Sequence, residues 1–105
     1  MFNGIVEQAT EDELANAAAL GDSTGMFNCP HTGVALAVLF KMINKGIIKK
    51  HQKVVVISTA HGLKFSNFKT LYHQQKLDGV SPKYANMPVE MEPDADKILG
   101  LIDSY

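Results

Sequence analysis

Residues 54–65, which read VVVISTAHGLKF, hold the densest set of side chains that could take part in chemistry. The segment opens with four β-branched apolar residues, and such a run without polar alternation is typical of a parallel strand covered on both faces. It then turns polar at Ser58, Thr59, His61 and Gly62. Ligands of open α/β sheets bind just outside the carboxyl ends of the strands, where these four residues are predicted to lie. The alternative is that Ser58 and Thr59 only cap the following helix.

Two short polar segments further upstream hold other side chains of chemical interest. Residues 22–25 and 31–33 place small hydroxyls and glycines at the entry of a predicted helix, where backbone N–H groups can bind an anion. Cys29 and His31 could form a thiol–imidazole pair, although nothing signals a third orienting group; the alternative is a small buried thiol. Lys64 could form a Schiff base or simply occupy an exposed helix turn. The four histidines lack metal-ligand spacing, so we expect no metal site.

The amino-acid composition indicates which cellular compartment and which classes of binding partner to expect. Ten lysines and no arginine face eleven acidic residues, so the sequence gives no footprint of a nucleic-acid-binding protein. Cys29 is the only cysteine, which excludes an intrachain disulfide and gives no support for secretion. The most apolar run, residues 34–43, is interrupted by Lys41 and is too short to span a bilayer. We expect a soluble intracellular chain without membrane contact, with residues 1–105 forming a single segment.

Local signals place the helices and strands that must position these residues. A capping box at Thr10 and Glu13 starts a helix near Glu11 that we expect to stop at Gly21. Pro30 suits the first position of a helix that closes at Gly46 and is apolar nearly all round, as a buried helix would be. The further predictions are short strands at 5–6 and 89–91, a strand at 53–58, and helices over about 63–75 and from Asp94 or Asp96.

This inventory predicts an α/β fold with few parallel strands flanked by helices. It also poses a problem, because one strand that is apolar on both faces needs neighbours to complete its hydrogen-bond ladder. The chain offers two or three strands in all. We therefore expect these residues to sit inside a larger sheet.

The motifs taken together resemble a known enzyme family. Residues 22–35 (DSTGMFNCPHTGVA), residues 55–65 and the tail at 72–73 and 84–90 closely resemble the C-terminal part of plant-type threonine synthase. The resemblance extends from Gly4 to Tyr105. It implies a tryptophan-synthase-β-like fold that uses pyridoxal phosphate, and a lyase that converts O-phosphohomoserine to threonine and phosphate. It also implies a plastid location, although the chain carries no transit peptide.

The resemblance implies a cofactor site as well as a fold. Thr59 matches the family residue that contacts the pyridine nitrogen of the cofactor, and a hydroxyl partner does not enforce a protonated ring. His61 and Gly62 would line the same pocket. The family's Schiff-base lysine and phosphate-binding loop lie N-terminal to the matched part and have no counterpart here, and Lys64 matches a different lysine. No catalytic residue is therefore assigned, and binding of the cofactor by this chain alone is in doubt.

Three hypotheses of function follow from these observations. The first is a truncated threonine synthase that is inactive alone, being a partial copy or one piece of a larger enzyme. The second is an interaction or regulatory module that pairs with full-length synthase, with another protein or with itself through its unsatisfied apolar faces. The third is a small independent enzyme that uses Cys29 and His31 or another pair of residues.

Overall fold

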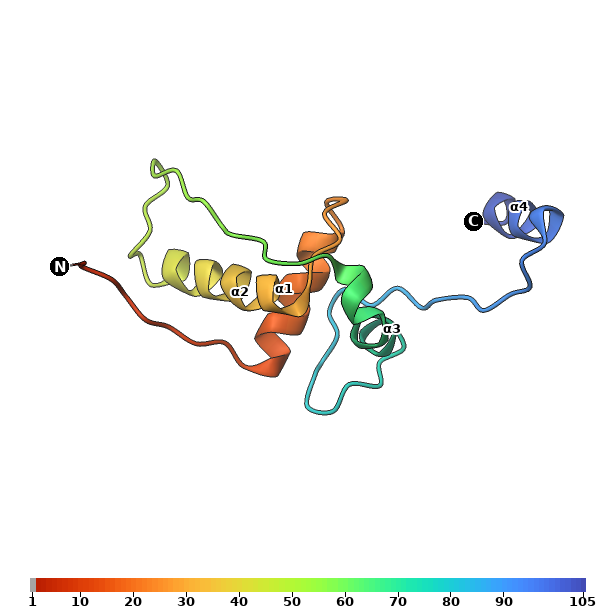
Figure 1. Ribbon diagram of the computed structural model, residues 1–105, viewed down its shortest axis with the longest axis horizontal. Helices are drawn as coiled ribbons and strands as arrows, with labels where there is room; N and C mark the ends of the chain where they lie inside the picture. Colours follow the sequence, from red (N-terminus) through yellow and green to blue (C-terminus); the bar gives the residue numbers. More distant parts are fainter. Residues whose placement is uncertain (1) are drawn as a thin grey trace.

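The computed structural model describes residues 2–105, which form four α-helices and one 3₁₀-helix joined by long extended segments (Figure 1). In chain order these are α1 (Glu11–Asp22), α2 (Pro30–Asn44), η1 (Gly62–Phe65), α3 (Ser66–His73) and α4 (Ala95–Asp103). The molecule measures 59 × 30 × 23 Å. Its radius of gyration is 16.8 Å, whereas a compact domain of this length has about 13 Å. The chain is therefore elongated.

Helix α1 begins where the sequence predicted. The Thr10 hydroxyl accepts a hydrogen bond from the Glu13 backbone N–H at 3.2 Å, and the Glu13 carboxylate accepts one from the Thr10 N–H at 2.8 Å. This reciprocal pair satisfies two of the donors left free at a helix N-terminus. The predicted stop at Gly21 is slightly short, because the helix includes Gly21 and ends at Asp22.

Helix α2 also has the predicted ends, with Cys29 as N-cap, Pro30 in its first turn, and Gly46 after it at a φ of +69°. It packs directly on α1. A Cβ built on Gly33 would lie 2.5 Å from the Leu14 carbonyl oxygen, so only glycine allows this approach. The prediction that α2 is buried all round is wrong, because Ile43 is 48% exposed. One face meets α1, and the opposite face has no helix or sheet against it.

The small core lies between α1, α2 and α3. Its buried members are Leu14, Ala15, Ala19 and Tyr72. The Tyr72 hydroxyl donates to the Asn16 side-chain oxygen at 2.8 Å, and the same oxygen accepts from the Lys83 N–H at 2.8 Å. These bonds tie α3 and the segment after it to α1. The helix predicted over 63–75 is thus confirmed in outline, as η1 followed by α3.

The prediction of an α/β fold with a few parallel strands flanked by helices is wrong for this structure. Within residues 2–105 there is no sheet, and the only strand-type pairing is an isolated antiparallel bridge between Asn28 and His61. The segment predicted as a buried strand is extended but unpaired, with Val55 89% and Ile57 74% exposed. Segments 5–6 and 89–91 are also irregular. A β-branched run favours extended backbone, but a strand requires a neighbour, and none of the described residues supplies one.

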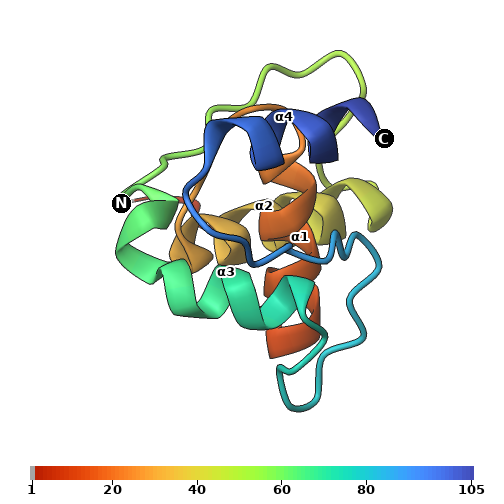
Figure 2. The same cartoon turned by 90° about the vertical axis from the view of Figure 1, so that its right-hand side faces the viewer.

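The C-terminal helix confirms its predicted start. The Asp94 side chain accepts a hydrogen bond from the Lys97 N–H at 3.0 Å and caps α4. No residue of α4 is buried, and the helix projects from one end of the molecule on an extended linker (Figure 1). Seen from that end, α4 lies in front of the other helices (Figure 2). Its apolar stripe of Ile98, Leu99 and Ile102 faces solvent.

Candidate functional site

The two motifs singled out in the sequence meet at the N-terminus of α2. The Cys29 N–H donates to the Ala60 carbonyl at 3.2 Å, and the Gly62 N–H donates to the Phe27 carbonyl at 2.8 Å. A Cβ on Gly62 would lie 2.8 Å from the Phe27 ring and 3.0 Å from the Asn28 carbonyl oxygen. Gly62 therefore allows the polar corner at 58–62 to lie directly against the residues that precede α2.

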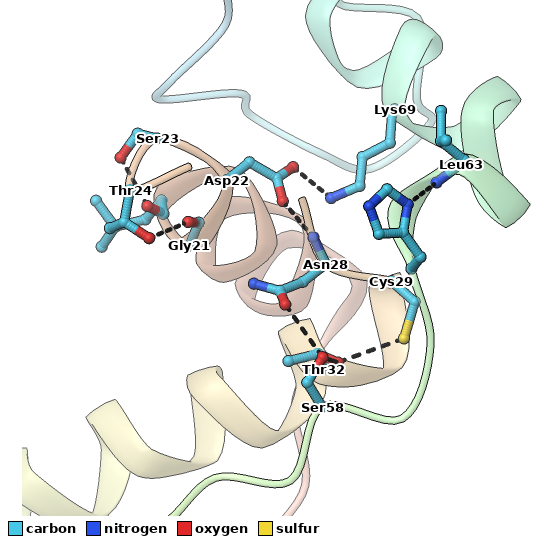
Figure 3. Close-up of polar contacts among 12 residues, drawn as sticks. Gly21, Asp22, Ser23, Thr24, Asn28, Cys29, Thr32, Ser58, Leu63 and Lys69 are labelled. Carbon is cyan, nitrogen blue, oxygen red and sulfur yellow. Dashed lines mark hydrogen bonds and ion pairs between the residues drawn. The ribbon is translucent and has the colours of Figure 1, made fainter. Parts of the chain in front are cut away.

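A chain of polar side chains joins the two motifs (Figure 3). The Ser58 hydroxyl donates to the Asn28 side-chain oxygen at 3.1 Å and lies 3.2 Å from the Thr32 hydroxyl. The Thr32 hydroxyl lies 3.4 Å from Cys29 Sγ, and Cys29 Sγ lies 3.6 Å from the Thr59 hydroxyl. We call these five residues, Asn28, Ser58, Thr32, Cys29 and Thr59, the polar relay. It runs without interruption from the loop before α2 to the corner.

Cys29 is the most enclosed member of the polar relay, with no exposed surface. Burial raises the pKa of its thiol, but hydrogen bonds from Thr32, Thr59 and Ala60 outweigh burial and lower the pKa to about 6. The sulfur contacts Thr32 and Thr59, whereas the His31 ring packs edge-on against Phe65 with centroids 5.5 Å apart. The structure thus shows no thiol–imidazole pair among the described residues, and the alternative of a small buried thiol fits.

A buried ion pair lies next to the polar relay and fixes the position of Asn28. Lys69 on α3 pairs with Asp22 at the end of α1, and both side chains are nearly buried. The second Asp22 oxygen accepts from the Asn28 N–H at 2.9 Å (Figure 3). The Lys69 ammonium also lies 5.3 Å from the centre of the Phe27 ring. Asn28 is therefore fixed through its backbone by α1 and through its side chain by Ser58.

Thr59 and His61 face an open hollow of about 410 Å³ beside the corner. Its walls are formed by Gly25, Met26, Phe27, Asn28, Ser58, Thr59, Ala60 and His61. None of these side chains is a carboxylate or a lysine. The His61 Nδ1 accepts from the Leu63 N–H at 3.2 Å, so the proton of the neutral ring is on Nε2. Gly62 is buried behind the corner and does not line this hollow.

The structure resolves two alternatives that the sequence left open. Ser58 and Thr59 do not cap the next helix, because His61 is the N-cap of η1. Lys64 lies exposed on η1, in agreement with its interpretation as a surface lysine. Sequence reasoning missed the role of Asn28. Its position two residues before Pro30 was the one available signal.

In the described part of the chain no three side chains form a metal cluster, and no helix is long and apolar enough to cross a membrane.

Comparison with known proteins confirms the resemblance that the motifs suggested. No protein-family model matches the chain. The chain is 48% identical over 103 residues to the chloroplastic threonine synthase 2 of Arabidopsis thaliana. The matched region covers 98% of this chain and is a C-terminal part of that protein. The chain is also 36% identical over 62 residues, 58% of its length, to threonine synthase of Methanocaldococcus jannaschii. The chain spans about one fifth of the first relative, and the second match spans 15% of that enzyme.

Proposed function

We propose, from its match to threonine synthase along 98% of its length, that this chain forms one wall of a pyridoxal-phosphate site in a threonine-synthase-type enzyme. The observation that carries the proposal is the corner at 58–62. The two matched motifs are 20 or more residues apart, yet they fold into one hydrogen-bonded unit that presents the Thr59 hydroxyl to an open hollow. The enzyme as a whole would convert O-phosphohomoserine to threonine and phosphate, in a plastid.

The residues around the hollow fit the ring side of such a cofactor. The Thr59 hydroxyl can hydrogen-bond to a ring nitrogen, and the His61 ring offers an aromatic edge beside it. Gly62 acts behind them, because its missing Cβ allows the corner to rest on Phe27 and Asn28. Bound there, pyridoxal phosphate would supply an electron sink for the chemistry at the substrate carbons. The contribution of these residues is to orient the ring and limit its contact with water.

We further propose that the 105 residues do not turn over the substrate on their own. Lys64 is exposed on η1, and the walls of the hollow offer neither a lysine nor a phosphate cradle. A cofactor held on one side only has little positional restraint, and most of the catalytic advantage of a bound reactant comes from restraint. Activity would then require a second polypeptide segment that carries the lysine.

Complementation provides the test. The recombinant chain is mixed with pyridoxal phosphate and O-phosphohomoserine, with or without a separately expressed Arabidopsis threonine synthase 2 segment that precedes the matched region. We expect no phosphate release from the chain alone and release from the mixture. Clear turnover by the chain alone would exclude the claim that it is incomplete. A stable complex without any turnover would exclude the claim that it forms a cofactor wall.

One further observation favours a second function, that of an interaction module. The chain exposes 7979 Å² of surface, whereas a compact protein of its mass exposes about 5,800 Å². The excess is about 2,200 Å², which is larger than the roughly 800 Å² that each partner buries in a standard protein interface. Under this proposal the chain regulates a full-length synthase by binding through the extended segment that holds Val55 and Ile57. Co-purification with full-length Arabidopsis threonine synthase 2, lost in Val55→Lys, is expected; equal recovery of both forms would argue against it.

A further inference from the structure

Charge is divided unevenly along the chain. Residues 23–77 hold eight of the ten lysines and no acidic residue, whereas residues 78–105 hold six of the eleven acidic residues and two lysines. The turn after α2, which belongs to the basic part, lies toward the opposite end of the long axis from α4, which belongs to the acidic part (Figure 1). Opposite charges at separate places on one surface favour association between copies.

An apolar hollow of about 620 Å³ lies in the basic part, between α2 and the segment that follows it. Lys49 and Lys50 line this hollow and make no ion pair within residues 2–105. We call it the basic groove. Its apolar lining comes from four residues, Leu39, Ile43, Ile48 and Val54.

Helix α4 has the shape and charge of a ligand for such a groove. It has nine residues, none of them buried, and a helix shorter than about 12–15 residues is marginal in water unless it packs on something. Ile98, Leu99 and Ile102 follow the spacing by which an amphipathic helix is anchored in an apolar groove. Asp96 and Asp103 are seven residues apart, so both lie along one edge of this stripe.

Other hollows of the described chain suit an acidic helix less well. The hollow between α1, α2 and α3 is lined by Glu11, and the one beside Asn44 is lined by Asp12 and Glu13. Carboxylates there would repel α4. A further apolar hollow, beside Leu36, has no charged side chain in its lining. The basic groove combines an apolar lining with unpaired lysines.

We propose that α4 docks in the basic groove of a second copy of this chain. The stripe of Ile98, Leu99 and Ile102 then covers the apolar lining, and Asp96 and Asp103 lie beside the two lysines. Each copy offers one helix and one groove at separate places, so two copies related by a two-fold axis make both contacts twice. The basic groove shares no residue with the hollow beside Thr59, so this pairing does not rest on the proposed cofactor site.

Charge exchange between two variants tests the pairing. The groove variant carries Lys49→Glu and Lys50→Glu, and the helix variant carries Asp96→Lys and Asp103→Lys. Sedimentation equilibrium over a concentration series is expected to show a monomer–dimer equilibrium for the wild type. Each variant alone places like charges in contact, so its Kd for dimerisation is expected to rise about tenfold or more. An equal mixture of the two variants pairs opposite charges again and should form a heterodimer with a Kd near that of the wild type.

The matched control carries Lys64→Glu and Lys76→Glu, which are exposed, lie outside the groove and change the net charge by the same amount. It should keep the wild-type Kd, and circular dichroism should show the wild-type helix content in every variant. A wild type that stays monomeric, or a dimer that the groove and helix variants do not weaken, would overturn the proposal. Folded variants that fail to form the heterodimer would overturn it as well, because α4 would then not bind the groove of another copy.

Discussion

The Asp22–Lys69 ion pair is the contact on which the rest of the site depends most directly. Both side chains are nearly buried, and Asp22 also fixes the Asn28 backbone. In Asp22→Asn the Lys69 charge stays buried without a counter-charge, which is expected to cost about 3–5 kcal/mol in the free energy of unfolding. Urea denaturation followed by circular dichroism measures this loss. Glu92→Gln removes an exposed pair with Lys97 and is expected to cost less than about 1 kcal/mol, so equal losses would contradict the argument.

His73 makes stability depend on pH in a direction that follows from its contacts. Burial lowers the pKa of His73; the Asp22 charge raises it and the Lys69 charge lowers it. Its Nδ1 accepts a hydrogen bond from the Asn86 N–H at 3.0 Å, which requires the neutral ring. Below the unfolded pKa of 6.5 the unfolded chain binds more protons than the folded chain, so stability is lost as pH falls below that value.

The measurement for His73 is the free energy of unfolding as a function of pH, together with exchange protection of the Asn86 amide. Both are expected to fall below pH 6.5 in the wild type and to change less in His73→Gln. His51→Gln, in an exposed loop, should keep the wild-type pH dependence. A wild-type profile that is retained by His73→Gln would contradict the assignment.

At the scale of elements, the contact between α1 and α2 sets the position of the Cys29 N-cap. Gly33 permits it, since a Cβ there would clash with the Leu14 carbonyl oxygen at 2.5 Å. Gly33→Ala must push the two helices apart, and overpacking of this kind costs about 1–3 kcal/mol. Gly100→Ala in α4 has nothing within 4 Å and is expected to stabilise its helix slightly. Similar thermal shifts for the two variants would contradict this account of the packing.

The elements also show how much of the structure could be predicted from the sequence. The ends of α1, α2 and α4 depend on nearby residues, such as Thr10 with Glu13 and Asp94 with Lys97, so local motifs were sufficient. The strand at 53–58 failed because its existence depends on a neighbouring strand, which no local pattern reports. The polar relay joins residues about 30 positions apart, so spacing alone could not reveal it. The sequence suggested Thr59 and His61 as site candidates and noted Thr32 only as a hydroxyl at a helix entry, whereas the role of Asn28 required coordinates.

At the scale of the whole molecule, the excess surface and the unpaired segment at 54–57 predict weak cooperativity in isolation. The small core of the chain consists of Leu14, Ala15, Ala19 and Tyr72, and no residue of α4 is buried. We expect a broad thermal transition by calorimetry for the isolated chain, and a sharper one at higher temperature when the complementing segment is added. A sharp two-state transition of the isolated monomer would contradict the view that these residues need a partner.

The central claim is that the Thr59 corner forms a wall of the cofactor site, and the most direct measurement is phosphate release by the complemented pair. The measurement compares three mixtures of this chain with the complementing segment, in which the chain is wild type, Thr59→Val or the exposed control Thr70→Val. Loss of the hydrogen bond to the ring nitrogen is expected to lower the rate about tenfold in Thr59→Val. The Thr70→Val pair should keep the wild-type rate. Equal rates for the two pairs, with equal complex formation, would contradict the claim.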